Sequence, residues 1–136
     1  MGIFQETDRI MDFIKIIPLM KCIDMDQSLH FYTKILDFEE DGRWPSAGSP
    51  SFSQIHRDDI RIQLSTHGGD GVAGNVVTII VEDVDELYKK YLSRGLNTSN
   101  KNNSPVHQSP IDQTWGWREF YVADPSDNTL RFVQKL

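Results

Sequence analysis

The chain has 136 residues, of which 38% are hydrophobic and 25% are charged, and its formal net charge is −6. This length fits one domain with a substantial core, while a single cysteine excludes an internal disulfide framework and a Cys-x-x-Cys zinc motif. The basic residues are scattered, which argues against nucleic acid as a partner, and no run of about 20 apolar residues predicts a membrane span. We therefore expect a cytoplasmic protein whose one cysteine, Cys22, is a buried small hydrophobe.

The first half of the chain is predicted to form a strand, a helix and three more strands. Residues 1–13 carry acidic side chains among apolar ones and predict an N-terminal arm, not a signal sequence. Residues 14–23 predict a strand in which Pro18 indicates a sheet edge or an irregular start, because proline has no N–H to donate. Asp24 and Gln27 resemble a capping-box helix start. The apolar residues that follow at helical spacing are Met25, Leu29, Tyr32 and Ile35 or Leu36. The next strands are predicted at residues 38–44, 51–57 and 60–66.

The second half repeats this plan in register. Residues 74–81 predict a strand, and Asp83 with Glu86 begins a helix that Gly95 ends. Three residues of the first half, Asp24, Asp26 and Tyr32, recur 59 places later as Asp83, Asp85 and Tyr91. The remaining strands are predicted at residues 106–113, 117–122 and 129–135. The glycine-rich segment 67–73 and the polar segment 97–109 are predicted to be loops.

The fold class that these elements predict is α+β, with one domain at residues 14–136. It consists of two βαβββ modules, at about residues 14–67 and 74–136. Within the strand at residues 60–66, apolar and polar side chains alternate, so Ile62 and Leu64 share one face and Arg61 and Gln63 share the other. We expect the apolar face to carry the helices and the opposite face to line a concave cavity.

Three separated segments carry a family resemblance. They are IPLMKCIDMDQSLHFYTKILDF at residues 17–38, VVTIIVEDVDELYKKY at residues 76–91 and WGWREFYVADPSDNTLRF at residues 115–132. In this order they resemble the vicinal oxygen chelate superfamily (glyoxalase, bleomycin resistance protein and dioxygenase). Bleomycin-resistance proteins are the most similar branch, because they share the Ile-Pro opening, an Arg-Asp-Asp turn and the Asp-Pro ending. The resemblance implies a cupped mixed sheet and a homodimer with clefts between its subunits.

Metal-dependent members of this superfamily hold an ion with His, Gln or Glu side chains on four strands. Carried over one by one, these positions are Ile17, Gln63, Val76 and Arg131 here. Isoleucine and valine have no donor atom, and an arginine repels a cation. Among the histidines, His56 is the one that the strand pattern allows to face the cavity. The sequence therefore predicts no metal, no cofactor and no catalytic residue.

The aromatic residues of the last segment suggest a different use for the cavity. Trp117, Glu119 and Tyr121 share one face of their strand, and Trp115 lies at its rim. The resemblance to bleomycin-resistance proteins implies that a tryptophan at this place stacks on flat parts of the drug. Trp115 matches that tryptophan best, and Trp117 is the alternative. For each tryptophan alone, core packing or a dimer interface is the competing interpretation. The ligand-binding residues that we predict are Trp44, Phe52, His56, Gln63, Trp115, Trp117, Glu119 and Arg131, the last two as an ion pair.

We expect a small-molecule-binding protein, not an enzyme, that sequesters a flat cationic antibiotic of the bleomycin type without a metal. Aromatic faces attract such a cation, and the acidic net charge tolerates it. Asp58 and Asp59 are interpreted as turn acids, or as acids that attract the cation near the cavity mouth. One alternative is a metal-dependent or atypical enzyme of the same superfamily, of glyoxalase, lyase, isomerase or dioxygenase type. Another is a binding module for a different metabolite.

Overall fold

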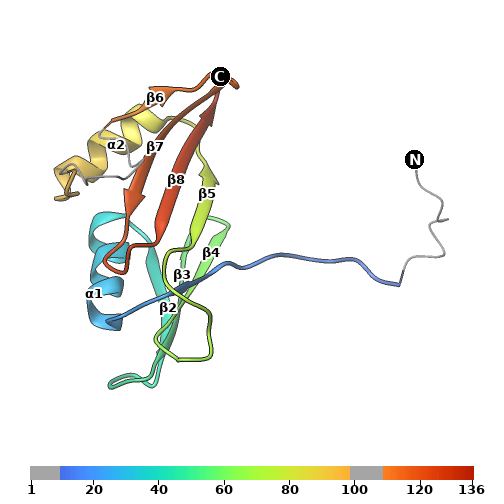
Figure 1. Ribbon diagram of the computed structural model, residues 1–136, viewed down its shortest axis with the longest axis vertical. Coiled ribbons are helices and arrows are strands. Elements are labelled where there is room, and N and C mark those ends of the chain that lie inside the picture. Colours follow the sequence, from blue (N-terminus) through green and yellow to red (C-terminus); the bar gives the residue numbers. More distant parts are fainter. Residues whose placement is uncertain (1–9, 99–108) are drawn as a thin grey trace.

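The computed structural model describes residues 10–98 and 109–136, and it places both helices on one side of two four-stranded sheets (Figure 1). The strand orders are β1-β4-β3-β2 and β5-β8-β7-β6, so each sheet repeats the same plan. The first strand of each module runs parallel to the last one, while the other pairs are antiparallel. The predicted pair of βαβββ modules is confirmed.

The first module begins with a strand that is much shorter than predicted. Its elements are β1 (Leu19–Lys21), α1 (Met25–His30), the π-helical turn η2 (Phe31–Ile35), β2 (Glu39–Trp44), β3 (Phe52–Arg57) and β4 (Ile60–Ser65). The prediction of a strand over residues 14–23 is therefore wrong at both ends. Pro18 explains the late start, because it lacks an N–H and contributes only its carbonyl, which accepts from the Gln63 amide at 2.9 Å.

The second module follows the predicted order. Its elements are β5 (Val76–Ile80), α2 (Val84–Ser93), β6 (Ile111–Asp112), β7 (Trp117–Ala123) and β8 (Thr129–Lys135). Of the strand predicted at residues 106–113, the described part forms only the two-residue β6. Residues 106–108 of that prediction, and most of the loop predicted at residues 97–109, lie outside the described residues. No helix in the described ranges is long and apolar enough to cross a membrane.

Both helices begin as the repeated acidic motif predicts. The Asp24 carboxylate accepts from the Gln27 amide at 3.0 Å, and the Asp83 carboxylate accepts from the amides of Asp85 and Glu86, both at 3.1 Å. An N-cap of this kind satisfies amide groups that have no partner within the helix. The repeat therefore has a physical basis, since the same acid starts the helix in each module.

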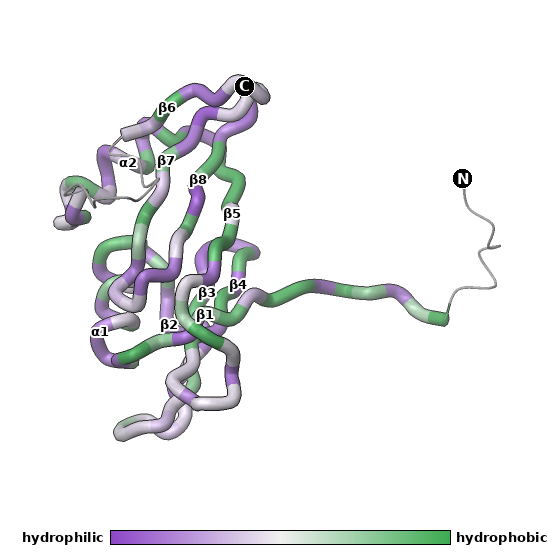
Figure 2. The backbone as a smooth tube through the Cα atoms, viewed as in Figure 1, coloured by the Kyte–Doolittle hydropathy of each residue, from purple (hydrophilic) through white to green (hydrophobic). Residues whose placement is uncertain are grey.

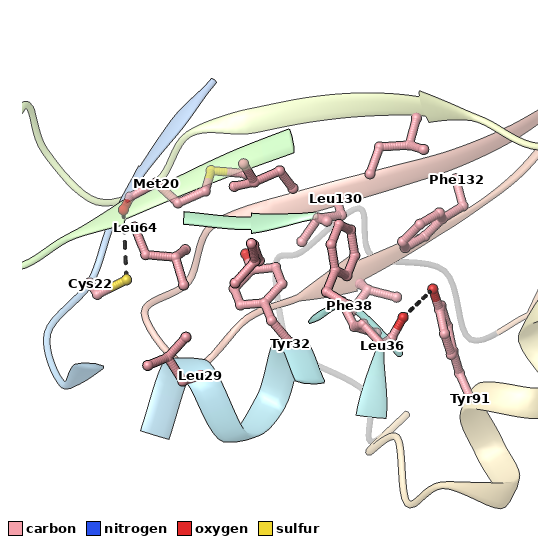
Figure 3. Close-up of a cluster of buried hydrophobic side chains, with 14 of the residues drawn as sticks. Met20, Cys22, Leu29, Tyr32, Leu36, Phe38, Leu64, Tyr91, Leu130 and Phe132 are labelled. Carbon is pink, nitrogen blue, oxygen red and sulfur yellow. Dashed lines mark hydrogen bonds between the residues drawn. The ribbon is translucent and has the colours of Figure 1, made fainter. Parts of the chain in front are cut away.

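The helices and the inner faces of both sheets enclose one shared core (Figure 3). Tyr32 and Tyr91, which the repeat relates, are both buried, and the Phe120 and Phe132 rings stack with centroids 5.2 Å apart. Cys22 is also buried, as predicted, and burial raises the pKa of its thiol. Because residues of both modules contribute, the two halves stabilise each other.

The turn between β7 and β8 joins the second module to the first through buried hydrogen bonds. The Asp124 carboxylate accepts from the Tyr32 hydroxyl at 2.7 Å, and Ser126 Oγ accepts from the Ile23 amide at 2.9 Å. Asn128 Nδ2 donates to the Lys21 carbonyl at 2.9 Å. Asp124 and Asn128 are buried, so these bonds satisfy polar groups that water does not reach. The turn is thus part of the contact between modules.

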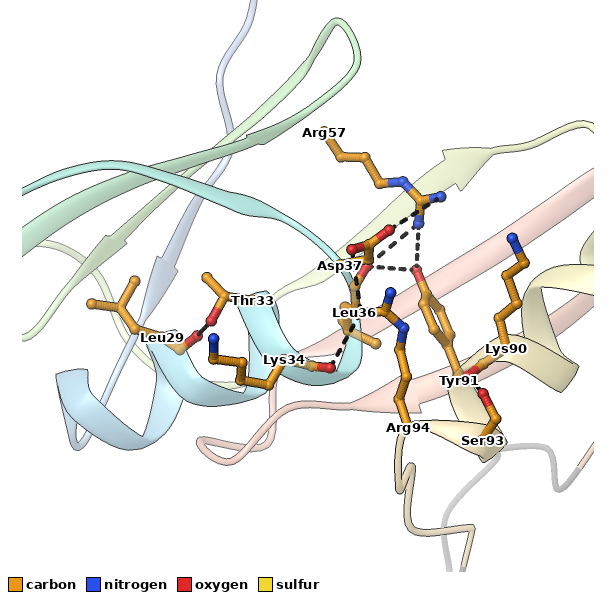
Figure 4. A network of polar contacts seen from close by, with 10 residues as sticks. All are labelled: Leu29, Thr33, Lys34, Leu36, Asp37, Arg57, Lys90, Tyr91, Ser93 and Arg94. Carbon is orange, nitrogen blue, oxygen red and sulfur yellow. Dashed lines mark hydrogen bonds and ion pairs between the residues drawn. The ribbon is translucent and has the colours of Figure 1, made fainter.

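A second polar contact between the modules surrounds Tyr91 (Figure 4). The Tyr91 hydroxyl donates to the Leu36 carbonyl at 3.1 Å, and Asp37 forms ion pairs with Arg94 at 3.2 Å and Arg57 at 3.9 Å. Burial raises the pKa of Tyr91 to about 12. The ring lies in the core, with its centroid 5.5 Å from that of Phe132.

Residues 10–16 leave the body of the protein as an extended arm (Figure 1). The arm is largely hydrophobic along its length, as Figure 2 shows. Its five large apolar side chains are each at least 66% exposed: Ile10, Met11, Phe13, Ile14 and Ile16. Such a row of apolar side chains is unusual on the surface of a monomeric protein.

Candidate functional site

The predicted ligand-binding residues of the first sheet lie on the face opposite the helices. We call this side of both sheets the open face. Phe52 alternates along β3 with the buried Ser53, and Trp44 lies opposite Phe52 in the register. The Trp44 and Phe52 ring centroids are 6.2 Å apart, with a 33° angle between the planes. Trp44 is 56% exposed, although large aromatic side chains are mostly buried.

Gly42 allows the Trp44 indole to lie against its own strand. A Cβ atom at Gly42 would come within 2.5 Å of the indole ring, so any other residue at this position would force the ring to move. The glycine precedes Trp44 by two positions, so both face the same side of β2. Trp44 therefore presents one ring face to the open side, and this position suits the stacking of a flat molecule.

Polar side chains continue this surface toward the other end of β3. Gln63 Nε2 donates to Gln54 Oε1 at 3.4 Å, and Gln54 Nε2 donates to the Asp41 carboxylate at 3.0 Å. His56 contacts the Asp41 carboxylate through Nδ1, and its Nε2 lies 3.2 Å from Glu39. The hydrogen bond from Gln54 is the main cause that lowers the pKa of Asp41. His56 is thus held between two carboxylates.

The open face of the second sheet is built around a buried carboxylate. Glu119 is 0% exposed, and Arg131 Nη2 lies 3.0 Å from its Oε2, so the predicted ion pair is confirmed. The Tyr121 hydroxyl donates to Glu119 at 3.1 Å, and the Arg131 guanidinium lies 5.0 Å from the Tyr121 ring centroid. These contacts offset the cost of burying the Glu119 charge. Within the described chain, the buried Nε of Arg131 has no hydrogen-bond partner.

The two remaining tryptophans lie at the start of β7. Trp115 is 56% exposed and precedes Gly116, whose φ of +86° favours glycine. Trp117 is partly buried as the first residue of the strand. The Gly116 carbonyl accepts from the Leu136 amide at 2.9 Å, which fixes the turn against the C-terminus. Trp115 therefore lies in the turn before β7 with more than half of its surface in water.

The structure divides the eight predicted residues into two groups of four, one on each sheet. For the described part of the chain, every hydrogen bond, ion pair and ring contact of these residues stays within its own sheet. Sequence reasoning did not include Asp41, Gln54 and Tyr121 in the site. The period-two alternation from Phe52 to His56 predicts the orientation of Gln54, whereas the position of Asp41 depends on a β-bulge between Glu40 and Gly42.

The four positions that carry metal ligands in metal-dependent members do not suit a metal ion in this chain. Ile17 and Val76 offer hydrocarbon only, and the Arg131 guanidinium already pairs with Glu119. Gln63 remains as a single neutral donor. Within residues 10–98 and 109–136, no three His, Cys, Asp or Glu side chains converge as metal ligands.

Comparison with known proteins agrees with this architecture. A family model for glyoxalase superfamily proteins matches residues 4–136. The bleomycin resistance protein of Geobacillus stearothermophilus is 28% identical over 145 residues, covering 88% of this chain and 96% of the relative. The bleomycin resistance determinant encoded on transposon Tn5 has a TM-score of 0.71 at 21% identity, covering 90% of this chain and 98% of that one. The bleomycin-binding protein of Streptomyces verticillus, solved with copper(II)-bleomycin, has a TM-score of 0.68 at 25% identity, with 90% and 96% coverage. Because the family model spans nearly the whole sequence, the chain belongs to the glyoxalase superfamily.

Proposed function

We propose that this protein binds a flat, cationic antibiotic of the bleomycin type on its open face and sequesters it without making or breaking a bond. The observation that carries the proposal is the exposure of two tryptophans, Trp44 on the open face and Trp115 in the turn before β7, each with 56% of its surface in water. The similarity to a bleomycin resistance protein and to bleomycin-binding structures supports the choice of ligand.

The physical basis of binding is stacking combined with charge. Each aromatic contact is worth about 0.5–1.5 kcal/mol beyond its buried area, and a cation over a tryptophan face adds about 0.5–2 kcal/mol. The net charge of −6 favours a cationic ligand at long range. Arg131 does not oppose this attraction strongly, because Glu119 neutralises it at 3.0 Å.

We infer that the binding unit is a homodimer in which the first-sheet residues of one copy face the second-sheet residues of the other. Two observations support this arrangement. The eight predicted residues form two groups without a direct polar or ring contact between them in the described chain. The exposed arm at residues 10–16 also needs a surface to cover it, and burying each of its large apolar side chains is worth about 1.5–3 kcal/mol.

Binding is tested by titrating the protein with metal-free bleomycin and following tryptophan fluorescence. We expect saturable quenching at micromolar drug, both with and without added divalent ions. Replacing Trp115 with alanine is expected to weaken binding about 5- to 30-fold, which corresponds to about 1–2 kcal/mol of lost stacking and cation–π energy. Calorimetry measures the variant, because the substitution removes one of the fluorescent reporters.

The matched control is His30→Ala, an exposed position on α1 whose replacement is expected to leave the affinity unchanged. Absence of quenching at micromolar drug, or an unaltered affinity of Trp115→Ala, contradicts the proposal. About one transition metal per purified chain, together with an activity that chelation abolishes, supports the enzyme alternative instead.

The dimer is tested by sedimentation equilibrium. The full chain is expected to have twice the 15.7 kDa mass of one copy. A chain that lacks residues 1–16 is expected to dissociate at a higher concentration, because the interface loses the five apolar side chains that each arm would bury in it. A mass of one copy at micromolar concentration for the full chain argues against the dimer.

A further inference from the structure

A cavity of about 690 Å³ lies between the two modules and away from the predicted ligand-binding residues. It is bounded on one side by the turn between β3 and β4, and on the other by the end of β5 and the start of α2. None of the eight predicted residues lines it. Its volume is within the range of about 300–1,000 Å³ that small-molecule sites occupy, and such sites often lie between structural units.

The floor of this inter-module cavity is apolar. Phe38, Ile79, Tyr91 and Phe132 line it, and all four belong to the core cluster. The hydroxyl of Tyr91 is already bonded to the Leu36 carbonyl at 3.1 Å, so the ring presents hydrocarbon to the cavity. A ligand that enters must therefore have an apolar part to replace the water over these rings.

The rim carries a surplus of carboxylates. Five acids line the cavity, Asp58, Asp59, Glu82, Asp83 and Glu86, against two cations, Arg57 and Lys90. Asp83 caps α2, but the other four acids form no ion pair within the described part of the chain. Because negative charges gathered around the apolar cavity create a negative potential there, they favour the entry of a cation.

The positive contributions near the cavity are weaker than these carboxylates. The N-terminus of α2 carries roughly half of one positive charge, and the Asp83 cap offsets it. Arg57 is turned toward Asp37 at 3.9 Å and toward the Leu36 carbonyl and the Tyr91 hydroxyl, both at 3.5 Å. The Arg57 charge is thus partly balanced by Asp37 of the same module, and the net charge around the cavity stays negative.

We propose that the inter-module cavity is a second binding site, which takes a small organic cation with an aromatic or aliphatic body. The apolar body lies on the ring floor, and the cationic group faces Asp58, Asp59 and Glu82 at the rim. The open face and this cavity are formed by different residues, so the second site does not depend on the proposed antibiotic binding.

The test uses three indoles of similar size that differ in charge: tryptamine, the neutral alcohol tryptophol and the anion indole-3-acetate. Each is titrated into ¹⁵N-labelled protein, and amide shifts are followed by NMR. We expect tryptamine to bind most tightly and to shift the amides of residues 57–60, 79–83 and 86–87, which line the cavity. We expect tryptophol to bind several-fold more weakly and indole-3-acetate more weakly still.

The double variant Asp59→Asn, Glu82→Gln is expected to lower the tryptamine affinity about three- to tenfold and to leave the tryptophol affinity unchanged. Both residues are exposed, so the variant folds. The control Glu40→Gln, at an exposed position of the outer strand β2, is expected to match the unmodified protein. Equal affinities for the three indoles, or shifts confined to the open face, overturn the proposal.

Discussion

Replacing Asp124 with asparagine is expected to lower the free energy of unfolding by about 2–4 kcal/mol. The buried carboxylate accepts from the amides of Ser126 and Asn128 at 2.8 and 2.9 Å through Oδ1. Through Oδ2 it accepts from Tyr32 Oη and Asn128 Nδ2 at 2.7 and 3.0 Å. An asparagine keeps one acceptor oxygen only, so its NH2 group must face donors wherever it is turned. Urea unfolding followed by circular dichroism measures the loss.

The control for this substitution is Glu40→Gln, which makes the same change from carboxyl to amide at an exposed position of β2. It is expected to alter stability by less than about 0.5 kcal/mol. If the two variants lose equal stability, net charge explains the effect and the buried hydrogen bonds do not. A loss specific to Asp124→Asn establishes that the buried hydrogen bonds of the β7–β8 turn stabilise the fold.

The second large effect is expected at alkaline pH and depends on Tyr91. Burial raises its pKa in the folded protein to about 12 from the ordinary value of 10.0. Below pH 10 both the folded and the unfolded chain keep the proton, and the full stability is present. Between pH 10 and pH 12 the unfolded chain loses it first, so stability falls as pH rises. A pKa difference of two units between the folded and unfolded chain corresponds to a loss of about 2–3 kcal/mol in the free energy of unfolding.

This dependence is measured by urea unfolding at pH 8 and at pH 11.5, in the unmodified protein and in Tyr91→Phe. The phenylalanine variant is less stable at pH 8 by about 1 kcal/mol, because the hydrogen bond to Leu36 is lost. Its further loss at pH 11.5 is expected to be about 2 kcal/mol smaller than that of the unmodified protein. Burial also raises the pKa of Tyr32. Both proteins contain Tyr32, so both are expected to lose some stability as the pH rises. Parallel losses in the two proteins would falsify the assignment to Tyr91.

The parts of the fold that the sequence predicts are those fixed by local chemistry. The two helix starts follow from an acid that caps the amides two or three residues later, and this requires no knowledge of the tertiary structure. The alternation of side chains along a strand likewise predicts which face carries Trp44 in β2 and which face carries Glu119 in β7. The short β1 is the exception, since Pro18 limits its pairing at one end.

The parts that could not be predicted depend on contacts between distant segments. Ser126 and Asn128 have the composition of an ordinary turn, and nothing local shows that they bond to Ile23 and Lys21. The inter-module cavity is similar, because Asp59 and Glu82 belong to different modules that only the folded chain brings together. Pattern reasoning interpreted Asp59 as a turn acid or as an acid near the mouth of the antibiotic cavity, and its position beside Glu82 at the inter-module cavity required the structure.

The bonds from the β7–β8 turn also constrain the order in which the molecule matures during synthesis. Their partners precede them by 92, 103 and 107 residues. A ribosome therefore releases Lys21, Ile23 and Tyr32 long before the turn exists, and until then these groups lack the partners that the turn provides. The contact between the two modules is therefore completed only after the β7–β8 turn has been synthesised.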